Sequence, residues 1–191
     1  QGNINSAGNL ISAGKNVTVT TDGGINNSAG HIQANKEIKL TGADINNSAG
    51  VINAKETLAL TAKLGGVTNE SGSISSGKQV DINTLSGLNR AQGKPDSTSG
   101  SIELNNINGS IVGVNGVNLN TGIVDNKQGK IASGTDININ TGTTDFRSVS
   151  GNLQSAGVTN ITAGSIDINQ GKVETGLGIS FNTTKLKLQD A

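Results

Sequence analysis

The sequence lacks whole classes of reactive and bulky side chains. Its 191 residues include no cysteine, methionine, tryptophan or tyrosine, and only two phenylalanines, one histidine and one proline. Without cysteine, the protein has no disulfide framework, no thiolate metal site and no thiol nucleophile. With so few aromatic rings, it has no stacking platform for single-stranded nucleic acid.

Charge is scarce and balanced, and long apolar runs are missing. Fourteen basic and 14 acidic residues give a net charge of zero, and only two of the basic residues are arginines. Phosphate backbones demand clustered Lys and Arg, so we expect no nucleic-acid partner. No apolar run approaches the length of a membrane span, and no basic-then-apolar signal opens the sequence. We therefore expect no membrane insertion of this segment.

The sequence does contain an internal repeat of about twenty residues. The segment INNSAGHIQA at 25–34 recurs as INNSAGVINA at 45–54. With one apolar residue taken as position 0 of each repeat, positions +7, +13 and +15 are apolar as well, with a single exception, Thr159. The eight sets are Ile4/Ile11/Val17/Val19, Ile25/Ile32/Ile38/Leu40, Ile45/Ile52/Leu58/Leu60, Val67/Ile74/Val80/Ile82, Leu104/Ile111/Val117/Leu119, Val124/Ile131/Ile137/Ile139, Phe146/Leu153/Thr159/Ile161 and Ile166/Val173/Ile179/Phe181.

Other columns of the repeat agree with this register. Position +5 is glycine in seven of the eight repeats, with Asn9 as the exception, and position +9 is always small. Apolar residues at +13 and +15 flank a residue that is polar in most repeats, and this period of two indicates strands with one buried face. Ile and Val together number 32 against 13 Leu, which also favours strands.

Strands this short need neighbours, and stacked repeats supply them. The sequence therefore predicts an all-β fold, a right-handed parallel β-helix (a solenoid) of about eight coils with three short strands per coil. The coils start near residues 4, 25, 45, 67, 104, 124, 146 and 166, within a single repeat segment that spans 1–191. We expect asparagines at the turns to hydrogen-bond in ladders along the axis.

One coil is interrupted at residues 84–102. About sixteen extra residues separate the fourth and fifth repeats, and we expect them to form a loop or short hairpin that leaves the shaft. Long loops on a rigid scaffold often carry binding, with Arg90, Lys94 and Pro95 as the exposed groups here. Residues 185–188 fall where a ninth coil begins, and both ends interrupt the pattern in mid-repeat, so we expect a fragment of a much longer chain.

The unit I-N-N-S-A-G-x-I-x-A followed by an apolar-x-apolar-Thr strand, as at 38–41 and 58–61, resembles the haemagglutinin repeats of filamentous haemagglutinin-like exoproteins. That resemblance covers nearly all of residues 4–182 and is weakest at 84–102. It implies a right-handed β-helical filament, secreted from Gram-negative bacteria by a two-partner system through an outer-membrane transporter. The family includes adhesins and the effectors of contact-dependent growth inhibition, which carry a toxin at their C-terminal end.

Three functions follow as hypotheses. The first is a structural filament segment at the surface of a Gram-negative cell, which projects an adhesive or toxin-delivering region. The alternative is an adhesion module that itself contacts a host glycan or a receptor on a neighbouring bacterium, through the loop or a polar face. A remote alternative is a β-helical carbohydrate-active enzyme.

An enzyme of that last kind needs two carboxylates about 5–9.5 Å apart. Asp125 and Asp167 share the outward +1 column two coils apart, roughly 10 Å by strand spacing, and Arg147 lies between them. The simpler interpretation is an exposed Asp-Arg-Asp charge ladder. Glu37 and Asp136 also share a column, but four coils separate them.

The remaining candidates carry no catalytic pattern. His31 stands alone at position +6 and is expected to be a surface turn residue. The sequence contains no G-x-S-x-G, no P-loop and no H-E-x-x-H motif. We therefore predict no enzyme activity, no catalytic, cofactor-binding or metal-binding residues, and no cofactor.

Overall fold

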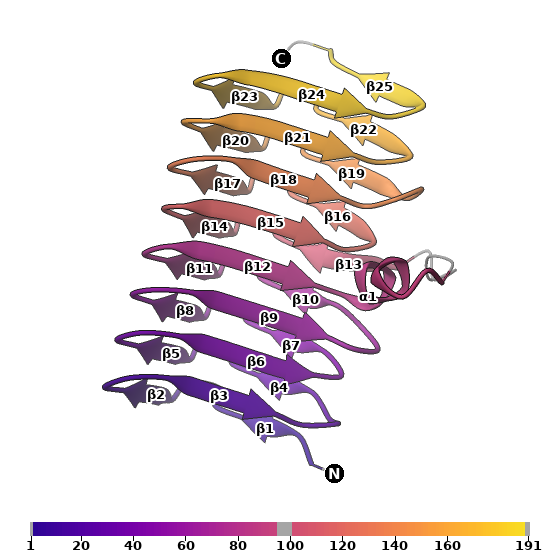
Figure 1. Cartoon of the computed structure of the whole chain (residues 1–191). Helices are drawn as coiled ribbons and strands as arrows, with labels where there is room; N and C mark the ends of the chain where they lie inside the picture. The colour runs from indigo at the N-terminus through magenta and orange to yellow at the C-terminus, as the bar shows by residue number, and fades with distance from the viewer. Residues whose placement is uncertain (1, 95–100, 190–191) are drawn as a thin grey trace.

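The computed structural model describes residues 2–94 and 101–189, which form a stack of coils. Each coil contributes one strand to each of three parallel sheets, and every strand pairs with its equivalents in the neighbouring coils (Figure 1). In Figure 1 the front strands run from left to right while the backbone rises from coil to coil, so the solenoid is right-handed. The predicted fold is therefore confirmed.

Three sheets, here called A, B and C, form the faces of the shaft. Sheet A contains β1 (Ile4–Asn5), β4 (Ile25–Asn26), β7 (Ile45–Asn46), β10 (Val67–Thr68), β13 (Ile102–Asn105), β16 (Ile123–Asp125), β19 (Asp145–Arg147), β22 (Ser165–Asp167) and β25 (Lys185–Lys187). Sheet B contains β2 (Leu10–Ala13), β5 (His31–Ala34), β8 (Val51–Ala54), β11 (Ser73–Ser76), β14 (Ser110–Gly113), β17 (Lys130–Ser133), β20 (Asn152–Ser155) and β23 (Lys172–Thr175). Sheet C contains β3 (Val17–Thr20), β6 (Ile38–Gly42), β9 (Leu58–Ala62), β12 (Gln79–Asn83), β15 (Gly116–Asn120), β18 (Ile137–Asn140), β21 (Val158–Thr162) and β24 (Gly178–Asn182).

The core is a column of aliphatic side chains, as the repeat register predicts. In coils 2 to 7, all four inward positions of every coil are buried. Thr159, the one polar member, is fully buried, and its hydroxyl lies 3.0 Å from the hydroxyl of Ser155. In coils 1 and 8 several of the same positions are partly open, as at Ile4 and Ile179, because each has a full described coil on one side only.

A second buried column is polar and was not predicted as part of the interior. Position +2 points inward in every coil, and all its members are buried: Ser6, Asn27, Asn47, Asn69, Asn106, Asn126, Ser148 and Ile168. The side-chain amides form one series of hydrogen bonds, in which Asn47 Nδ2 donates to Asn69 Oδ1 and Asn69 Nδ2 to Asn106 Oδ1, both at 2.7 Å. Ser6 begins this series and Ser148 ends it, so the bonded column crosses seven coils.

The turn that follows this column explains the regular spacing of glycine within the repeat. The left-handed residue is at position +4, for example Ala49 at φ 52° and Asn108 at φ 54°, one residue before the glycine. The glycine at +5 is required by close approach instead, because a Cβ on Gly72 would lie closer than 3.0 Å to the backbone oxygen of Asn47 in the coil before. Coil 1 is the first coil that the structure describes, and Asn9 is at this position there.

The interruption at 84–102 contains a helix, so the predicted loop or hairpin is wrong in detail. α1 (Leu85–Ala91) leaves the shaft after β12, and the backbone returns to the shaft at β13 (Figure 1). Leu85 and Leu88 are half-buried at helical spacing, and the backbone of Gly87 is packed against that of Asn120. The predicted ninth coil begins as expected, because β25 pairs in parallel with β22.

Candidate functional site

The predicted charge column is in register, but its ion pairing differs from the prediction. Asp125 and Arg147 are opposite each other in the register of neighbouring strands, and so are Arg147 and Asp167, as the repeat requires. The Arg147 guanidinium, however, lies 2.7 Å from Asp145, two residues before it on the same strand. Asp167 lies 3.7 Å from the ammonium group of Lys187 in the following coil. The expected Asp-Arg-Asp ladder is therefore replaced by two separate surface ion pairs.

Both aspartates also have a role in the backbone turns. The Oδ1 of Asp125 accepts the N–H of Lys127 at 3.0 Å, and that of Asp167 accepts the N–H of Asn169 at 3.2 Å. Asn and Asp at this position stabilise a turn by accepting the amide two residues on. Both carboxylates therefore have structural partners in the turns of sheet A.

The other single candidates lie apart on the surface. His31 is exposed at the start of β5, and Glu37 is exposed at the turn before β6. Asp136 is exposed and accepts the backbone N–H of Val158 at 2.7 Å. Within residues 2–94 and 101–189, no group of three His, Cys, Asp or Glu side chains is placed to hold a metal ion.

The prediction that Arg90 is an exposed binding group of the loop is wrong. Its guanidinium points back onto the shaft, where it donates to Asn120 Oδ1 at 3.1 Å, to the backbone oxygen of Thr121, and to that of Asn140 at 2.7 Å. Arg90 therefore anchors α1 and is not an exposed handle. Lys94 is exposed, whereas Pro95 lies outside the described residues.

A buried carboxylate holds the base of α1. Glu103 is 5% exposed, and it accepts hydrogen bonds from the Thr84 hydroxyl, from the N–H and hydroxyl of Ser86 at 3.1 and 2.6 Å, and from the N–H of Gly122 at 3.0 Å. A buried charged group is tolerated when hydrogen bonds replace its hydration. Glu103 and Arg90 together fix α1 against coils 5 and 6.

The most distinctive surface is the outward side of sheet C in coils 4 to 8, here called the asparagine face. Two rows of side chains point outward from each strand, at positions +14 and +16. The ten members of the asparagine face are Asp81, Asn118, Asn138, Asn160 and Ser180 at +14, and Asn83, Asn120, Asn140, Thr162 and Asn182 at +16. Seven of the ten are asparagine, although asparagine is depleted in strands.

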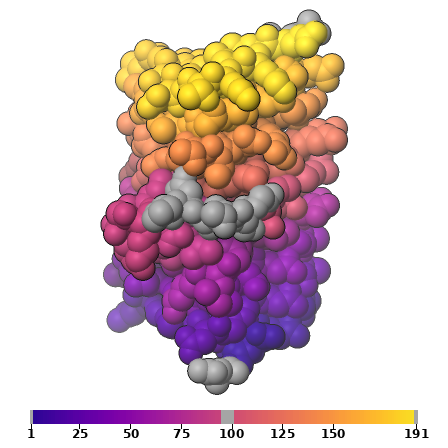
Figure 2. Space-filling view, turned by 90° about the vertical axis from the view of Figure 1, so that its right-hand side faces the viewer, coloured from indigo at the N-terminus to yellow at the C-terminus, as the bar shows by residue number. Residues whose placement is uncertain are grey.

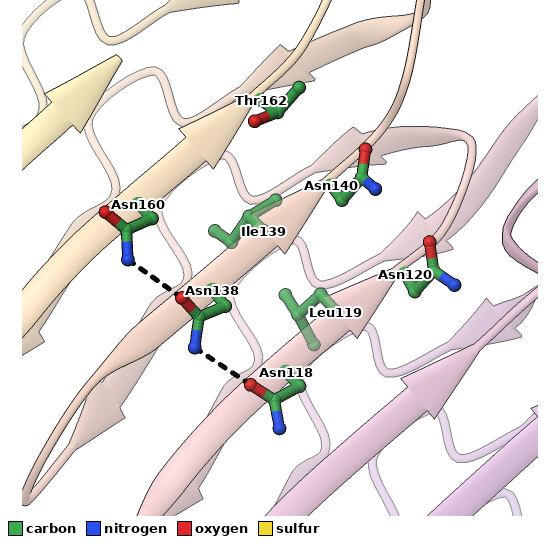
Figure 3. A pocket seen from close by; sticks show the side chains of 8 residues that line it. All are labelled: Asn118, Leu119, Asn120, Asn138, Ile139, Asn140, Asn160 and Thr162. Atoms are coloured by element: carbon green, nitrogen blue, oxygen red, sulfur yellow. Dashed lines mark hydrogen bonds between the residues drawn. The ribbon is translucent and has the colours of Figure 1, made fainter. Parts of the chain in front are cut away.

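The +14 row forms a one-directional amide ladder along the axis (Figure 3). Asn160 Nδ2 donates to Asn138 Oδ1 at 2.9 Å, and Asn138 Nδ2 donates to Asn118 Oδ1 at 3.0 Å. Asn118 Nδ2 then donates to the carboxylate of Asp81 at 2.9 Å. The ladder therefore ends on a negative charge, which favours the aligned amide N–H groups that point towards it.

The +16 row approaches α1 in coils 4 to 6, where α1 stands beside the ends of the sheet C strands (Figure 1). In Figure 2 this side of the shaft faces the viewer. Asn120 donates to the backbone oxygen of Gly87 in α1 at 3.2 Å, and Asn140 caps the turn at Gly142 with a bond of 3.0 Å. Between the two rows, the strands in coils 5 to 7 enclose a shallow groove of about 300 Å³. The groove offers amide donors and acceptors, and its lining carries no charged group.

Comparison with protein-family models, curated proteins and solved structures finds no match to this sequence. In the part of the protein that the structure describes, no helix has the length and apolar character of a membrane span.

Proposed function

We propose that this protein is a structural segment of a secreted filament, a rigid spacer that holds an adhesive or toxin-delivering region away from a Gram-negative cell. The observation that carries the proposal is continuity along the axis. An aliphatic core and a hydrogen-bonded polar column run through successive coils, and the described departures from the coil pattern are α1 and a register shift in β13 where the backbone rejoins the shaft.

The mechanism of such a spacer is additive. Each coil extends the shaft by about 4.8 Å, the distance between neighbouring strands. Each coil is also stabilised by contacts with its two neighbours, so reach and stability both grow with coil number. The resemblance of the repeats to filamentous haemagglutinin-like exoproteins supports the proposed export through an outer-membrane two-partner transporter.

Changing the number of coils tests the spacer. Deleting residues 25–66 removes coils 2 and 3 and joins Gly24 to Val67. Val67 then takes the place that Ile25 has in the intact protein, so the register of the repeat is kept. We expect the variant to fold with the same circular dichroism per residue and to be shorter by about 10 Å. The matched control deletes residues 30–71, which has the same length and joins Ala29 to Gly72, thereby preserving the register as well. A folded protein from either deletion supports interchangeable coils, and loss of folding by both contradicts them.

The asparagine face supports a second candidate function, adhesion by this segment itself. In coils 2 and 3 the +16 position is threonine, a good strand former, whereas coils 4, 5, 6 and 8 have asparagine there. The amide ladder explains the +14 row, and bonds to α1 and to the turn at Gly142 explain Asn120 and Asn140, but strand propensity does not explain asparagine at positions 83 and 182. We propose that the asparagine face contacts an uncharged glycan, whose hydroxyl groups both donate and accept hydrogen bonds as amides do.

Charge and shape define that ligand further. Asp81 places a carboxylate at one end of the ladder, which disfavours sulfated or carboxylated glycans. The groove is open and has no aromatic lining residue, so each sugar unit gains little and affinity must accumulate over several coils. A linear polymer that lies along the axis fits this requirement.

Removing two amides tests the second candidate. In the variant Asn138→Ala/Asn160→Ala, we expect the association constant for an uncharged glycan to fall at least about tenfold, because two hydrogen-bonding side chains are lost. Thr41→Ala/Thr61→Ala, on the same face of sheet C but in coils 2 and 3, is the matched control and leaves binding unchanged. Binding is measured on an array that contains uncharged and sulfated glycans. Absence of uncharged ligands, or equal binding by both variants, contradicts this candidate and leaves the spacer proposal intact.

A further inference from the structure

Coil 5 contains two Asn-Gly pairs, Asn108–Gly109 and Asn115–Gly116, in very different surroundings. Asn-Gly is the dipeptide in which a side-chain amide is attacked most readily by the following backbone nitrogen, because glycine presents no Cβ to obstruct the approach. Two identical pairs in one coil therefore allow a comparison in which only the surroundings differ.

Asn108–Gly109 is held in place. Asn108 has φ 54°, and the N–H of Gly109, the nitrogen that would attack, donates to the backbone oxygen of Asn106 at 3.0 Å. A Cβ on Gly109 would lie closer than 3.0 Å to atoms of Asn69, so this backbone has no room to rotate. Reaction here requires the coils to separate.

Asn115–Gly116 is open by comparison. Asn115 lies in the turn between β14 and β15 and is exposed, as Asn108 is, and both following glycines are buried. The difference is in the space around the glycine, because the nearest atoms to a Cβ on Gly116 are 3.9 Å away. The Asn115 N–H donates a hydrogen bond to the backbone oxygen of Lys78 at 2.7 Å, but the nitrogen that attacks the side-chain amide is that of Gly116. Gly116 has φ 152°, which side chains rarely adopt but which glycine leaves and re-enters at little cost.

The same position in coils 2 and 7 shows what that next nitrogen does there. Its equivalent is Glu37 in coil 2 and Val158 in coil 7, and both donate to a side chain of the preceding coil, at 3.3 and 2.7 Å. In these two coils the nitrogen is therefore bonded to a side chain, whereas Gly116 is the first residue of β15 and lies in register with Gln79 of β12. At coil 5 the preceding residue is Gln79, whose side-chain nitrogen donates to Asp81.

We propose that Asn115 is a site of spontaneous deamidation in the folded protein. The Gly116 nitrogen bonds to Asn115 Cγ and loses its proton to water, while the Cγ–Nδ2 bond breaks and ammonia leaves. Water then opens the five-membered imide. Hydrolysis between the Gly116 nitrogen and Asn115 Cγ gives aspartate. Hydrolysis between that nitrogen and the backbone carbonyl carbon of residue 115 gives isoaspartate, which adds one backbone carbon to the turn.

The two products differ in their effect on the shaft. Aspartate adds a negative charge in the column of Lys78, one coil earlier, and leaves the backbone length unchanged. Isoaspartate displaces the start of β15 relative to β14, where the N–H of Asn115 bonds to Lys78. We expect the isoaspartate form to be the less stable one.

Peptide mapping by mass spectrometry tests the proposal, because one tryptic peptide, 91–127, contains both pairs. The folded protein is incubated at 37 °C and mildly alkaline pH, and fragment ions assign each deamidated residue. We expect Asn115 to react at least about tenfold faster than Asn108, because Asn108 requires local opening. In concentrated urea the two rates become similar, which shows that the folded structure causes the difference.

Two variants complete the test. Asn115→Gln removes the five-membered ring and abolishes the reaction at this turn, while Asn108→Gln leaves the rate at Asn115 unchanged. Equal rates at Asn108 and Asn115 in the folded protein, or faster reaction at Asn108, overturn the proposal. Folding that slows the reaction at Asn115, relative to urea, by a larger factor than at Asn108 also overturns it.

Discussion

Replacing Gly109 with alanine is expected to lower the free energy of unfolding by about 3 kcal/mol, the upper part of the range for overpacking a tight interior. The added Cβ would lie closer than 3.0 Å to the backbone oxygen of Asn69 and 2.6 Å from Asn106 Oδ1. It therefore strikes the backbone of one coil and the buried amide column of its own coil. Neither can move without separating the coils, and urea denaturation measures the loss.

Gly14→Ala is the matched control for this variant. Gly14 has no atom within 4 Å of an added Cβ and no positive φ, so the same chemical change should alter the unfolding free energy by no more than about 0.5 kcal/mol. Similar losses in the two variants would show that glycine acts through backbone entropy and not through the approach of the coils.

Replacing Asn69 with alanine is expected to lower the free energy of unfolding by about 3 kcal/mol, because it breaks the buried amide series on both sides and leaves a cavity there. Asn47 Nδ2 loses the oxygen to which it donates at 2.7 Å, and Asn106 Oδ1 loses a donor at 2.7 Å. Both groups are fully buried, so water cannot replace Asn69 without entering the core.

Asn138→Ala provides the comparison, since Asn138 also occupies the middle of an asparagine ladder. Its partners, Asn118 and Asn160, lie at the surface of sheet C and can bond to water instead. The expected loss is about 0.5 kcal/mol. Equal losses at Asn69 and Asn138 would contradict the distinction between a buried column that supports the shaft and an exposed one that does not.

The repeating core was predictable because its signal is redundant. Four apolar positions recur in every coil, and parallel in-register stacking is the one arrangement that buries them all. Even Thr159, the single exception, occupies its predicted place. The same redundancy located the interruption between coils 4 and 5.

The polar interior was harder to predict, although its signal was present. Asparagine occurs at position +2 in five coils, yet asparagine is mostly exposed in proteins and favoured in turns. It becomes an interior residue here because each amide is bonded by the amides of neighbouring coils. That compensation depends on stacking distance and side-chain direction, which spacing in one sequence does not contain.

The structure of the interruption depends on contacts beyond its own sequence. α1 has only seven residues, includes Gly87, and is held by Arg90 and Glu103 through groups in coils 5 and 6. Helices this short are marginal on their own, so local propensity favoured a loop. For the same reason Arg90 was expected to be exposed. The asparagine face was visible as outward polar positions, but its bonding to α1 was not.

The central claim, an additive and rigid shaft, is tested most directly by a distance along the axis. Because the sequence has no cysteine, Ser12→Cys and Gln154→Cys can be spin-labelled uniquely. Both positions are exposed in the same column of sheet B. They are six coils apart, so we expect a narrow distance distribution near 29 Å from steps of about 4.8 Å, before the length of the labels is considered.

Deleting residues 25–66 between these labels removes two of the six steps. We expect double electron–electron resonance then to give an equally narrow distribution of label-to-label distances, shifted to about 19 Å. A broad distribution in the intact protein, or a mean that does not shorten by about 10 Å after the deletion, would contradict a rigid shaft built of additive coils.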